Sequence, residues 1–309
     1  MSIRASAPTR LDFGGGWTDV PPFPEERGGF VCNLAIERRA TVTLREPEGG
    51  EPPNDPLLHA ALTAHGLTHL VGTLQSDYPI GAGLGGSSAA GVAVAAAIAA
   101  WRGEVPSPSQ LAEASRRVEV EHLGIAGGRQ DHYAAAYGGA LGLHFGATVS
   151  ASPIALGAET VASLERRCLV VYTGESRISG DTIRAVLDSY AQRTPAVVFA
   201  LDRMAALARL MATALATGDV DALGALVGEH WVHQRALHPG ITTARIDALV
   251  AATAAAGALG AKPLGASGGG CVLVIAPTDR VTAVRQAARA LGDELPFRIA
   301  RTGVEVTRE

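Results

Sequence analysis

The order of hydrophobic and polar positions divides the chain into a strand-rich beginning, a helical middle and a strand-rich end. Short runs of aliphatic and β-branched residues predict strands at 31–36, 41–44, 72–77, 139–145, 169–173, 271–276 and 297–306. Apolar residues at helical spacing predict helices at 56–64, 87–101, 107–122, 130–137 and through most of 179–256. This order predicts an α+β fold with two halves, residues 1–165 and 166–309. Ser87 stands at the start of one helix, where we expect it to act as the N-cap.

The composition agrees with a compact folded protein. Of the 309 residues, 47% are hydrophobic and 18% are charged, and this length allows two domains with a large buried core. The formal net charge is −4, which gives no electrostatic reason to expect nucleic acid or an anionic membrane as a partner. The longest apolar run, 89–101, has 13 residues and is too short for a bilayer span, which needs about 20.

Cysteine usage and the N-terminus indicate a cytoplasmic protein. Three cysteines lie far apart in apolar runs, which is typical of buried side chains in a reducing compartment and of neither a disulfide framework nor a zinc site: Cys32, Cys168 and Cys271. Residues 1–10 lack the apolar core of a signal peptide.

Three glycine clusters lie next to regular segments, at 14–16, 81–86 and 268–270. Glycine at such junctions is typical of turns and of close approach between the backbone and a ligand. The second cluster leads into the helix 87–101. Because the N-terminus of a helix presents free N–H groups and a positive dipole end, we expect residues 81–88 to bind phosphate.

Two common nucleotide-binding motifs do not describe this segment. Gly81 and Gly86 have Walker A spacing, but Ser87 stands where that motif requires lysine. The glycines also satisfy the G-x-G-x-x-G pattern of dinucleotide-binding folds. However, Pro79 precedes them in place of a clear strand, and residues 106–110 show no strand that ends in an acid for a ribose.

A longer match is present in the same segment. Residues 79–90 read P-I-G-A-G-L-G-G-S-S-A-A and resemble the P-x-x-x-G-L-G-S-S-A-A signature of the GHMP kinases, which include galactokinase, homoserine kinase and mevalonate kinase. Residues 8–19 are similar to the galactokinase pattern P-G-R-V-N-L-I-G-E-H-T-D, with Arg10 and Asp19 on its Arg and Asp and Gly16 in place of its Glu. The variant G-G-W-T-D-x-P-P is more similar to the L-fucose kinase and heptose-phosphate kinase branch.

Further segments extend the resemblance over nearly the whole chain. Residues 260–271 resemble K-x-x-G-A-G-G-G-G-C, with Ser267 in place of one glycine. Residues 127–133, G-G-R-Q-D-H-Y, resemble the G-G-K-Q-D-Q-Y of heptose 7-phosphate kinases, and residues 173–179 resemble their T-G-x-S-R-x-S. The resemblance implies a two-domain GHMP kinase fold, with an N-terminal domain like the second domain of ribosomal protein S5 and a ferredoxin-like C-terminal domain.

The resemblance also implies an ATP-dependent kinase that uses Mg²⁺ and phosphorylates a sugar or sugar phosphate, with the anomeric C1 hydroxyl as the expected acceptor. The residues implied to bind the ATP phosphates are Gly81, Gly83, Gly85, Gly86, Ser87, Ser88, Gly268 and Gly269. The residues implied to bind the sugar are Arg10, Gly15, Gly16, Asp19, Asp131 and Arg177.

Magnesium takes hard oxygen ligands and keeps several of its waters. Ser87 or Ser88 offers a hydroxyl group for it. Glu119 offers a carboxylate and stands 12 residues before Asp131, which is the spacing of the metal-binding Glu in the galactokinase motif. Glu121 is the competing candidate, and either carboxylate could instead belong to a solvated helix face.

Asp131 is the candidate catalytic carboxylate, because a glycine-rich break before it lets the side chain point into a cleft. There it could accept the proton of a sugar hydroxyl or hold that hydroxyl in place. Arg10 could keep Asp131 ionised, since a nearby cation favours the charged carboxylate. Asp19 could accept hydrogen bonds from two sugar hydroxyls. The alternatives are structural: Asp131 as a helix N-cap and Asp19 as a turn residue before Pro21.

Other functions remain to be weighed against a sugar kinase. The chain contains no H-E-x-x-H metal motif, which argues against a metallohydrolase. Residues 265–269 satisfy G-x-S-x-G, but they lead into the predicted strand 271–276 and not into a helix, so no nucleophile elbow supports a serine hydrolase. A kinase of a non-sugar alcohol, of the mevalonate or homoserine type, is the first alternative. A non-catalytic homologue that binds a nucleotide or a sugar is the second. The identity of the sugar, the pathway and a homodimeric state are left open.

Overall fold

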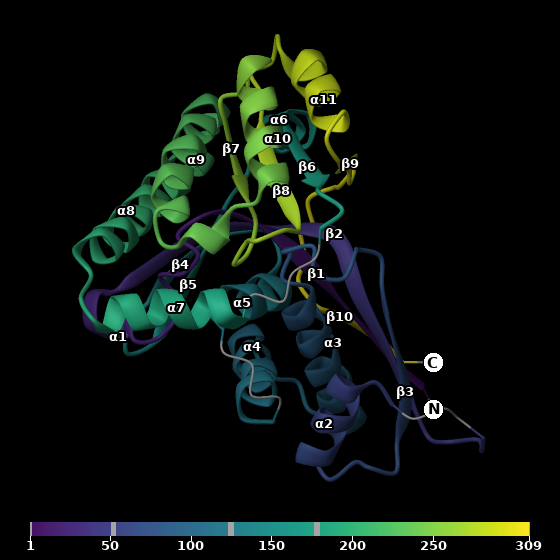
Figure 1. Cartoon of the computed structure of the whole chain (residues 1–309). Helices are drawn as coiled ribbons and strands as arrows, with labels where there is room; N and C mark the ends of the chain where they lie inside the picture. Colours follow the sequence, from purple (N-terminus) through teal and green to yellow (C-terminus); the bar gives the residue numbers. More distant parts are fainter. Residues whose placement is uncertain (1, 51–53, 123–126, 176–179, 309) are drawn as a thin grey trace.

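The computed structural model describes residues 2–50, 54–122, 127–175 and 180–308, the side chain of residue 122 excepted. Figure 1 shows two sheets, each covered by helices, joined at the ends of the long strands β1 and β2. The larger sheet has the order β10-β1-β2-β4-β5, with β3 also paired to β2, and the smaller has the order β7-β8-β6-β9. Paired strands are antiparallel throughout. The predicted α+β class is confirmed.

The strands are β1 Ser2–Gly14, β2 Gly29–Arg45, β3 Val71–Ser76, β4 Ala140–Phe145, β5 Val149–Ile154, β6 Cys168–Tyr172, β7 Gly260–Pro263, β8 Cys271–Ile275, β9 Asp293–Glu294 and β10 Glu305–Arg308. The helices are α1 Phe23–Arg27, α2 Pro56–Ala64, α3 Gly86–Trp101, α4 Pro108–Arg117, α5 Gln130–Tyr137, α6 Ala158–Arg167, α7 Gly180–Ala191, α8 Pro195–Thr217, α9 Val220–Arg235, α10 Ala244–Ala255 and α11 Val281–Arg289. A π-helical segment, Val118–His122, follows α4, and a 3₁₀ turn, Pro239–Ile241, precedes α10.

The start of α3 differs from the prediction. Gly85, with φ +73°, occupies the N-cap position, and no side chain caps the helix. Ser87, the predicted N-cap, lies inside the first turn, and its hydroxyl donates to Glu119 Oε1 at 2.9 Å. The first N–H groups of α3 therefore carry no side-chain partner, as expected for a helix end that receives an anion.

The predicted strand at 297–306 is wrong for most of its length. Only its end lies in a strand, because the preceding residues cross from one sheet to the other. Leu295 N–H donates to Val170 O of β6, whereas Ala300 N–H donates to Ala35 O of β2. Strand β10 then pairs with β1, which brings the two termini close together (Figure 1). The division into residues 1–165 and 166–309 stays a prediction.

Strand β1 changes the side to which its buried residues point. Ala5 and Ala7 pack in the cluster around α3, whereas Leu11 and Phe13 pack in the cluster that includes α8 and α9. The pairing of β1 with β2 shifts between Pro8 and Thr9, and such irregularities re-aim side chains next to functional sites. Arg10 follows directly and points toward α5 and the loop before α3, as its contacts below show.

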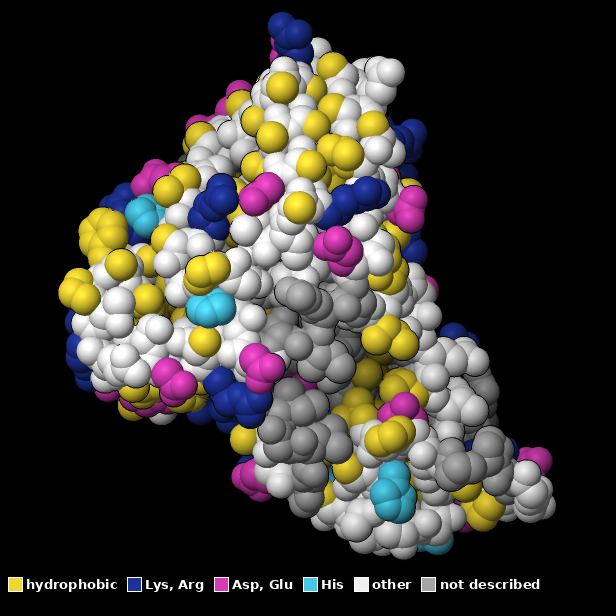
Figure 2. Space-filling view, in the orientation of Figure 1, with side chains coloured by type: hydrophobic (Ala, Val, Ile, Leu, Met, Phe, Trp, Pro, Cys, Tyr) yellow, Lys and Arg dark blue, Asp and Glu magenta, His cyan; other side chains and the backbone are white. Residues whose placement is uncertain are grey.

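Two predictions about the rest of the chain can be compared with the structure. All three cysteines are buried and unpaired, and burial raises the pKa of Cys168 and of Cys271 to about 12. Among the described residues, no helix is long and apolar enough to cross a membrane. On the face shown in Figure 2, acidic and basic side chains are interspersed.

Candidate active site

A cavity of about 650 Å³ lies where the end of β1, the loop before α3, the first turn of α5 and the loop after β7 meet, a volume typical of small-molecule sites. Most of the predicted site residues line it: Arg10, Gly16, Asp19, Gly81, Gly83, Gly85, Gly86, Ser87, Ser88, Glu119 and Asp131. Gly15, Gly268 and Gly269 are buried outside its lining. Arg177 lies outside the described residues.

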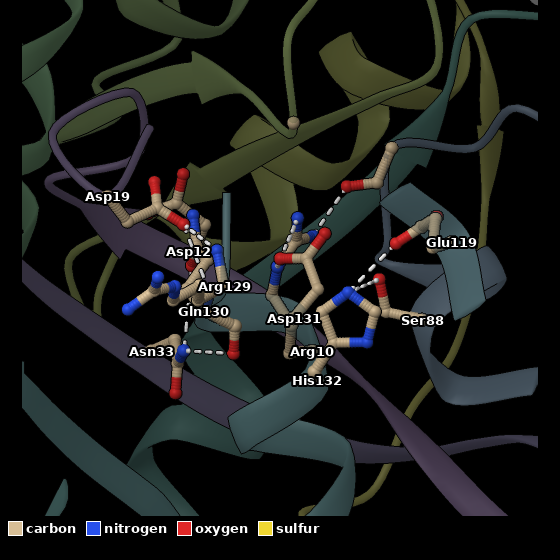
Figure 3. A network of polar contacts seen from close by, with 12 residues as sticks. Arg10, Asp12, Asp19, Asn33, Ser88, Glu119, Arg129, Gln130, Asp131 and His132 are labelled. Carbon is tan, nitrogen blue, oxygen red and sulfur yellow. Dashed lines mark hydrogen bonds and ion pairs between the residues drawn. The ribbon is translucent and has the colours of Figure 1, made fainter. Parts of the chain in front are cut away.

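Arg10 connects the glycine-rich loop with the candidate catalytic carboxylate. Its Nε donates to Asp131 Oδ1 at 2.8 Å, and a second guanidinium nitrogen lies 2.7 Å from the same oxygen (Figure 3). Its third nitrogen donates to Gly83 O at 2.6 Å. The arginine side chain is 3% exposed and that of Asp131 is 26% exposed. The arginine therefore holds the loop and the carboxylate together, while the carboxylate keeps an open side.

The glycines of the loop allow this close approach. A Cβ on Gly85 would lie 3.1 Å from the Asp131 carboxyl carbon, and the backbone there has φ +73°. Tyr78, whose hydroxyl donates to Gly86 O at 2.8 Å, packs so closely that a Cβ on Gly86 would lie 2.3 Å from its ring. Larger residues at either position would displace the loop.

The third glycine-rich segment lies against the same loop. Cys271 N–H donates to Ala82 O at 2.8 Å, and a Cβ on Gly83 would lie 2.5 Å from Leu264 O. Gly265 and Ala266, rather than the predicted Gly268 and Gly269, reach the cavity. Within this segment the cavity is therefore lined by the turn directly after β7.

Asp19 lines the cavity and caps α5. Its Oδ2 accepts from the N–H groups of Arg129 at 2.7 Å and Gln130 at 3.0 Å. Gly128 is required here, because a Cβ would lie 1.9 Å from the same oxygen. Burial raises the pKa of Asp19 to about 6. The negative charge of Asp131 also raises this pKa, whereas the two backbone hydrogen bonds lower it. The sequence anticipated its place in the site but not its role as a cap.

Glu119 and Ser87 place two oxygen ligands side by side on the cavity wall. Ser87 Oγ donates to Glu119 Oε1 at 2.9 Å, and His132 Nε2 lies 2.8 Å from Oε2. Burial raises the pKa of Glu119, but the hydrogen bonds from His132 and Ser87 lower it below its ordinary value. Glu121 is exposed and does not line the cavity. An ionised carboxylate next to a hydroxyl fits Mg²⁺, which takes few protein ligands.

No group of three or more His, Cys, Asp or Glu side chains suited to a metal is present among the described residues.

Sequence reasoning missed a buried ion pair at the wall of the cavity, which Asp12 lines. Lys262 Nζ donates to Asp12 O at 2.8 Å and lies 3.0 Å from Asp12 Oδ2, with both side chains at most 2% exposed. Burial would raise the pKa of Asp12, but the charges of Lys262 and Arg10 hold it below its usual range. Lys262 is the only lysine among 26 basic residues, which was a signal in the sequence.

A buried histidine supports the same strand end. His230 Nε2 accepts from Gly15 N–H at 2.9 Å. Burial and the charge of Lys262 lower the pKa of His230 to about 3, so the ring is neutral and can accept this bond. Gly15 is thus a structural turn residue with φ +90°, and a Cβ there would lie 1.9 Å from Phe30 O.

Comparisons with known proteins agree on one family. Residues 57–139 match the model of the GHMP kinases N terminal domain, and residues 211–294 match that of the GHMP kinases C terminal domain. The chain is 26% identical over 342 residues to the D-glycero-alpha-D-manno-heptose 7-phosphate kinase of Campylobacter jejuni, covering 99% of both chains. It is 27% identical over 317 residues to the bifunctional fucokinase/GDP-fucose pyrophosphorylase of Arabidopsis thaliana, covering 88% of this chain but only 30% of that protein.

The solved structures agree on the fold. The crystal structure of a D-glycero-D-manno-heptose 1-phosphate kinase from Bacteroides thetaiotaomicron superposes with a TM-score of 0.78 at 23% identity, covering 99% of each chain.

Proposed function

The chain belongs to the GHMP kinases, phosphotransferases with an alcohol group as acceptor, and from this premise we propose that it transfers the γ-phosphoryl group of ATP to a sugar or sugar-phosphate hydroxyl. The proposed acceptor is the anomeric C1 hydroxyl. One observation carries the proposal: the Asp131 carboxylate lies against Gly85 of the glycine-rich loop and is held there by Arg10. A phosphoryl donor in the loop and an acceptor hydroxyl at Asp131 would then be neighbours.

The phosphate side is proposed to use the backbone of residues 81–88. The uncapped N–H groups of α3 would donate to the β- and γ-phosphates, with the positive end of the helix dipole behind them. Apolar and aromatic residues at this end of the cavity suit the base of ATP: Leu57, Leu74, Tyr78, Pro79 and Ile80. Ser87 and Glu119 would hold Mg²⁺, which neutralises charge on the phosphates when bound.

The acceptor side is proposed to use Asp131, Arg10 and Asp19. Asp131 would accept the proton of the attacking hydroxyl or orient that hydroxyl as charge develops. Arg10 would fix the carboxylate toward the loop, since it bonds both. Asp19, whose Oδ2 serves α5, would offer Oδ1 to a sugar hydroxyl.

The similarity to heptose-phosphate and fucose kinases supports a sugar over other alcohols. The direct test is ADP formation from ATP and Mg²⁺ with a panel of free sugars and sugar phosphates, followed by NMR to locate the new phosphate. We expect turnover with a sugar and phosphate on C1. Turnover only with mevalonate or homoserine would replace the proposed substrate class, and saturable binding without ADP would indicate a non-catalytic binding protein.

A further inference from the structure

The residue after Asp131 faces away from the acceptor and holds the candidate metal ligands. His132 is 1% exposed, and Figure 3 shows its ring next to Ser88 and Glu119. Its Nε2 lies 2.8 Å from Glu119 Oε2 and 3.3 Å from Ser88 Oγ. Its Nδ1 lies 3.0 Å from Ser115 Oγ. Both ring nitrogens are therefore occupied, and each partner comes from a different element.

The partners determine how the ring is oriented. The carboxylate of Glu119 only accepts hydrogen bonds, so Nε2 must be an N–H that donates to it. Nδ1 faces the hydroxyl of Ser115, which can donate to the neutral ring or accept from the protonated one. Gly91 of α3 allows this contact, because a Cβ there would lie 2.3 Å from Ser115 Oγ. The ring is thus fixed in rotation.

We infer that His132 is a positioning residue for the metal-bound nucleotide, fixing the Glu119 carboxylate and with it the Ser87 hydroxyl in the orientation that binds Mg²⁺. The inference rests on the proposed function. Mg²⁺ requires nearly ideal octahedral geometry, so a ligand that rotates freely binds it less well. Hydrogen-bond partners of metal ligands typically contribute 10- to 100-fold in metal affinity.

Two amide substitutions separate positioning from packing. The amide nitrogen of Gln reaches the place of the imidazole Nε2, whereas that of Asn reaches only the place of Nδ1. His132→Gln therefore keeps the donor to Glu119, and His132→Asn removes it while leaving an amide in the same pocket. Tyr133→Phe is the matched control, because it removes a hydrogen bond from the next residue of α5 to Glu113, away from Glu119.

The measurement is the affinity for ATP by calorimetry, in Mg²⁺ and in EDTA. We expect Mg²⁺ to increase the affinity of the wild type, His132→Gln and Tyr133→Phe by similar factors. In His132→Asn this gain should fall by ~10-fold or more, with the affinity in EDTA unchanged. The Mg²⁺ concentration for half-maximal turnover should rise by the same factor.

Each other outcome overturns the inference. An unchanged Mg²⁺ gain in His132→Asn, or equal losses in both amide variants that follow their melting temperatures, would mean that the histidine only packs. If His132→Asn does not fold, Ser115→Ala replaces it. This variant removes the hydrogen bond that fixes the ring and should lower the Mg²⁺ gain ~3-fold, less than the loss of a whole hydrogen-bond partner. An unchanged Mg²⁺ gain in Ser115→Ala would overturn the inference. If Mg²⁺ did not change the ATP affinity of the wild type, both the proposed metal site and this inference would be wrong.

Discussion

Two residues on the same face of β1 form ion pairs with opposite properties. Arg10 pairs with Asp131, whose side chain is 26% exposed and faces the cavity. Asp12, two residues later, pairs with Lys262, and at most 2% of either side chain is exposed. The first pair leaves one carboxylate oxygen available to a ligand. Asp12 also lines the cavity, but Lys262 binds its Oδ2 and its backbone oxygen, and this buried pair joins β1 to β7. Accessibility, and not charge, therefore separates a pair suited to chemistry from one suited to holding the two sheets together.

The largest expected effect concerns the Arg10–Asp131 pair. Asp131→Asn should lower kcat by ~10²- to 10⁴-fold, because the amide cannot accept the proton of the acceptor hydroxyl. ATP binding should persist, and the free energy of unfolding should change little, since the amide oxygen can still accept from Arg10. Steady-state kinetics with the substrate found in the sugar panel, together with calorimetry, check this. Near-normal turnover would reject the role of Asp131.

The Asp12–Lys262 pair should affect the stability of the fold. Lys262→Met leaves the carboxylate of Asp12 buried without a partner and should lower the free energy of unfolding by about 3–5 kcal/mol, measured in urea. The double variant with Asp12→Asn should recover most of this loss, because no uncompensated charge remains. If the single and double variants were equally stable, Asp12 would not depend on Lys262.

Asp19 extends the comparison of Asp131 and Asp12, because, unlike them, it forms no ion pair among the described residues. Its pKa of about 6 lies above the unfolded value of about 3.9, so the native state binds the proton more tightly. Its contribution to stability is therefore present below the unfolded pKa, is lost as the pH rises through 6, and is constant above about pH 7. Relative to Asp19→Asn, the wild type should lose about 2 kcal/mol between pH 4 and 7. Parallel stability curves for the two proteins would contradict the raised pKa.

The smallest expected effect tests the space around the Asp12–Lys262 pair. A Cβ on Gly16 would lie 2.5 Å from Asp12 Oδ2, which Lys262 holds in place. Gly16→Ala should therefore lower the free energy of unfolding by about 1–3 kcal/mol, as for other overpacked sites. The control is Gly146→Ala, whose added Cβ meets only an ordinary contact at 3.7 Å, with an expected change within about 0.5 kcal/mol. Equal stability of both variants would show that Asp12 can move.

Much of the fold and part of the site could be predicted from local patterns. The helix Pro56–Ala64 has the predicted bounds, and the glycine-rich segment 81–86 leads into a helix as its sequence predicts. By contrast, residues 297–304 belong to the predicted strand 297–306 but lie outside the named strands, because the backbone here crosses from one sheet to the other. Helix α1 has only five residues, too few for a helical period to be detected.

The amino-acid sequence by itself determined the motifs, their order and the residue types that phosphoryl transfer needs, because each motif is a local run whose backbone freedom and donor groups depend on its own residues. Only the tertiary structure decided that Arg10 contacts Asp131, 121 residues away. It also decided that Lys262 pairs with Asp12 and that His132 pairs with Glu119. These choices depend on which side chains share one buried space, and burial arises only when distant segments pack together.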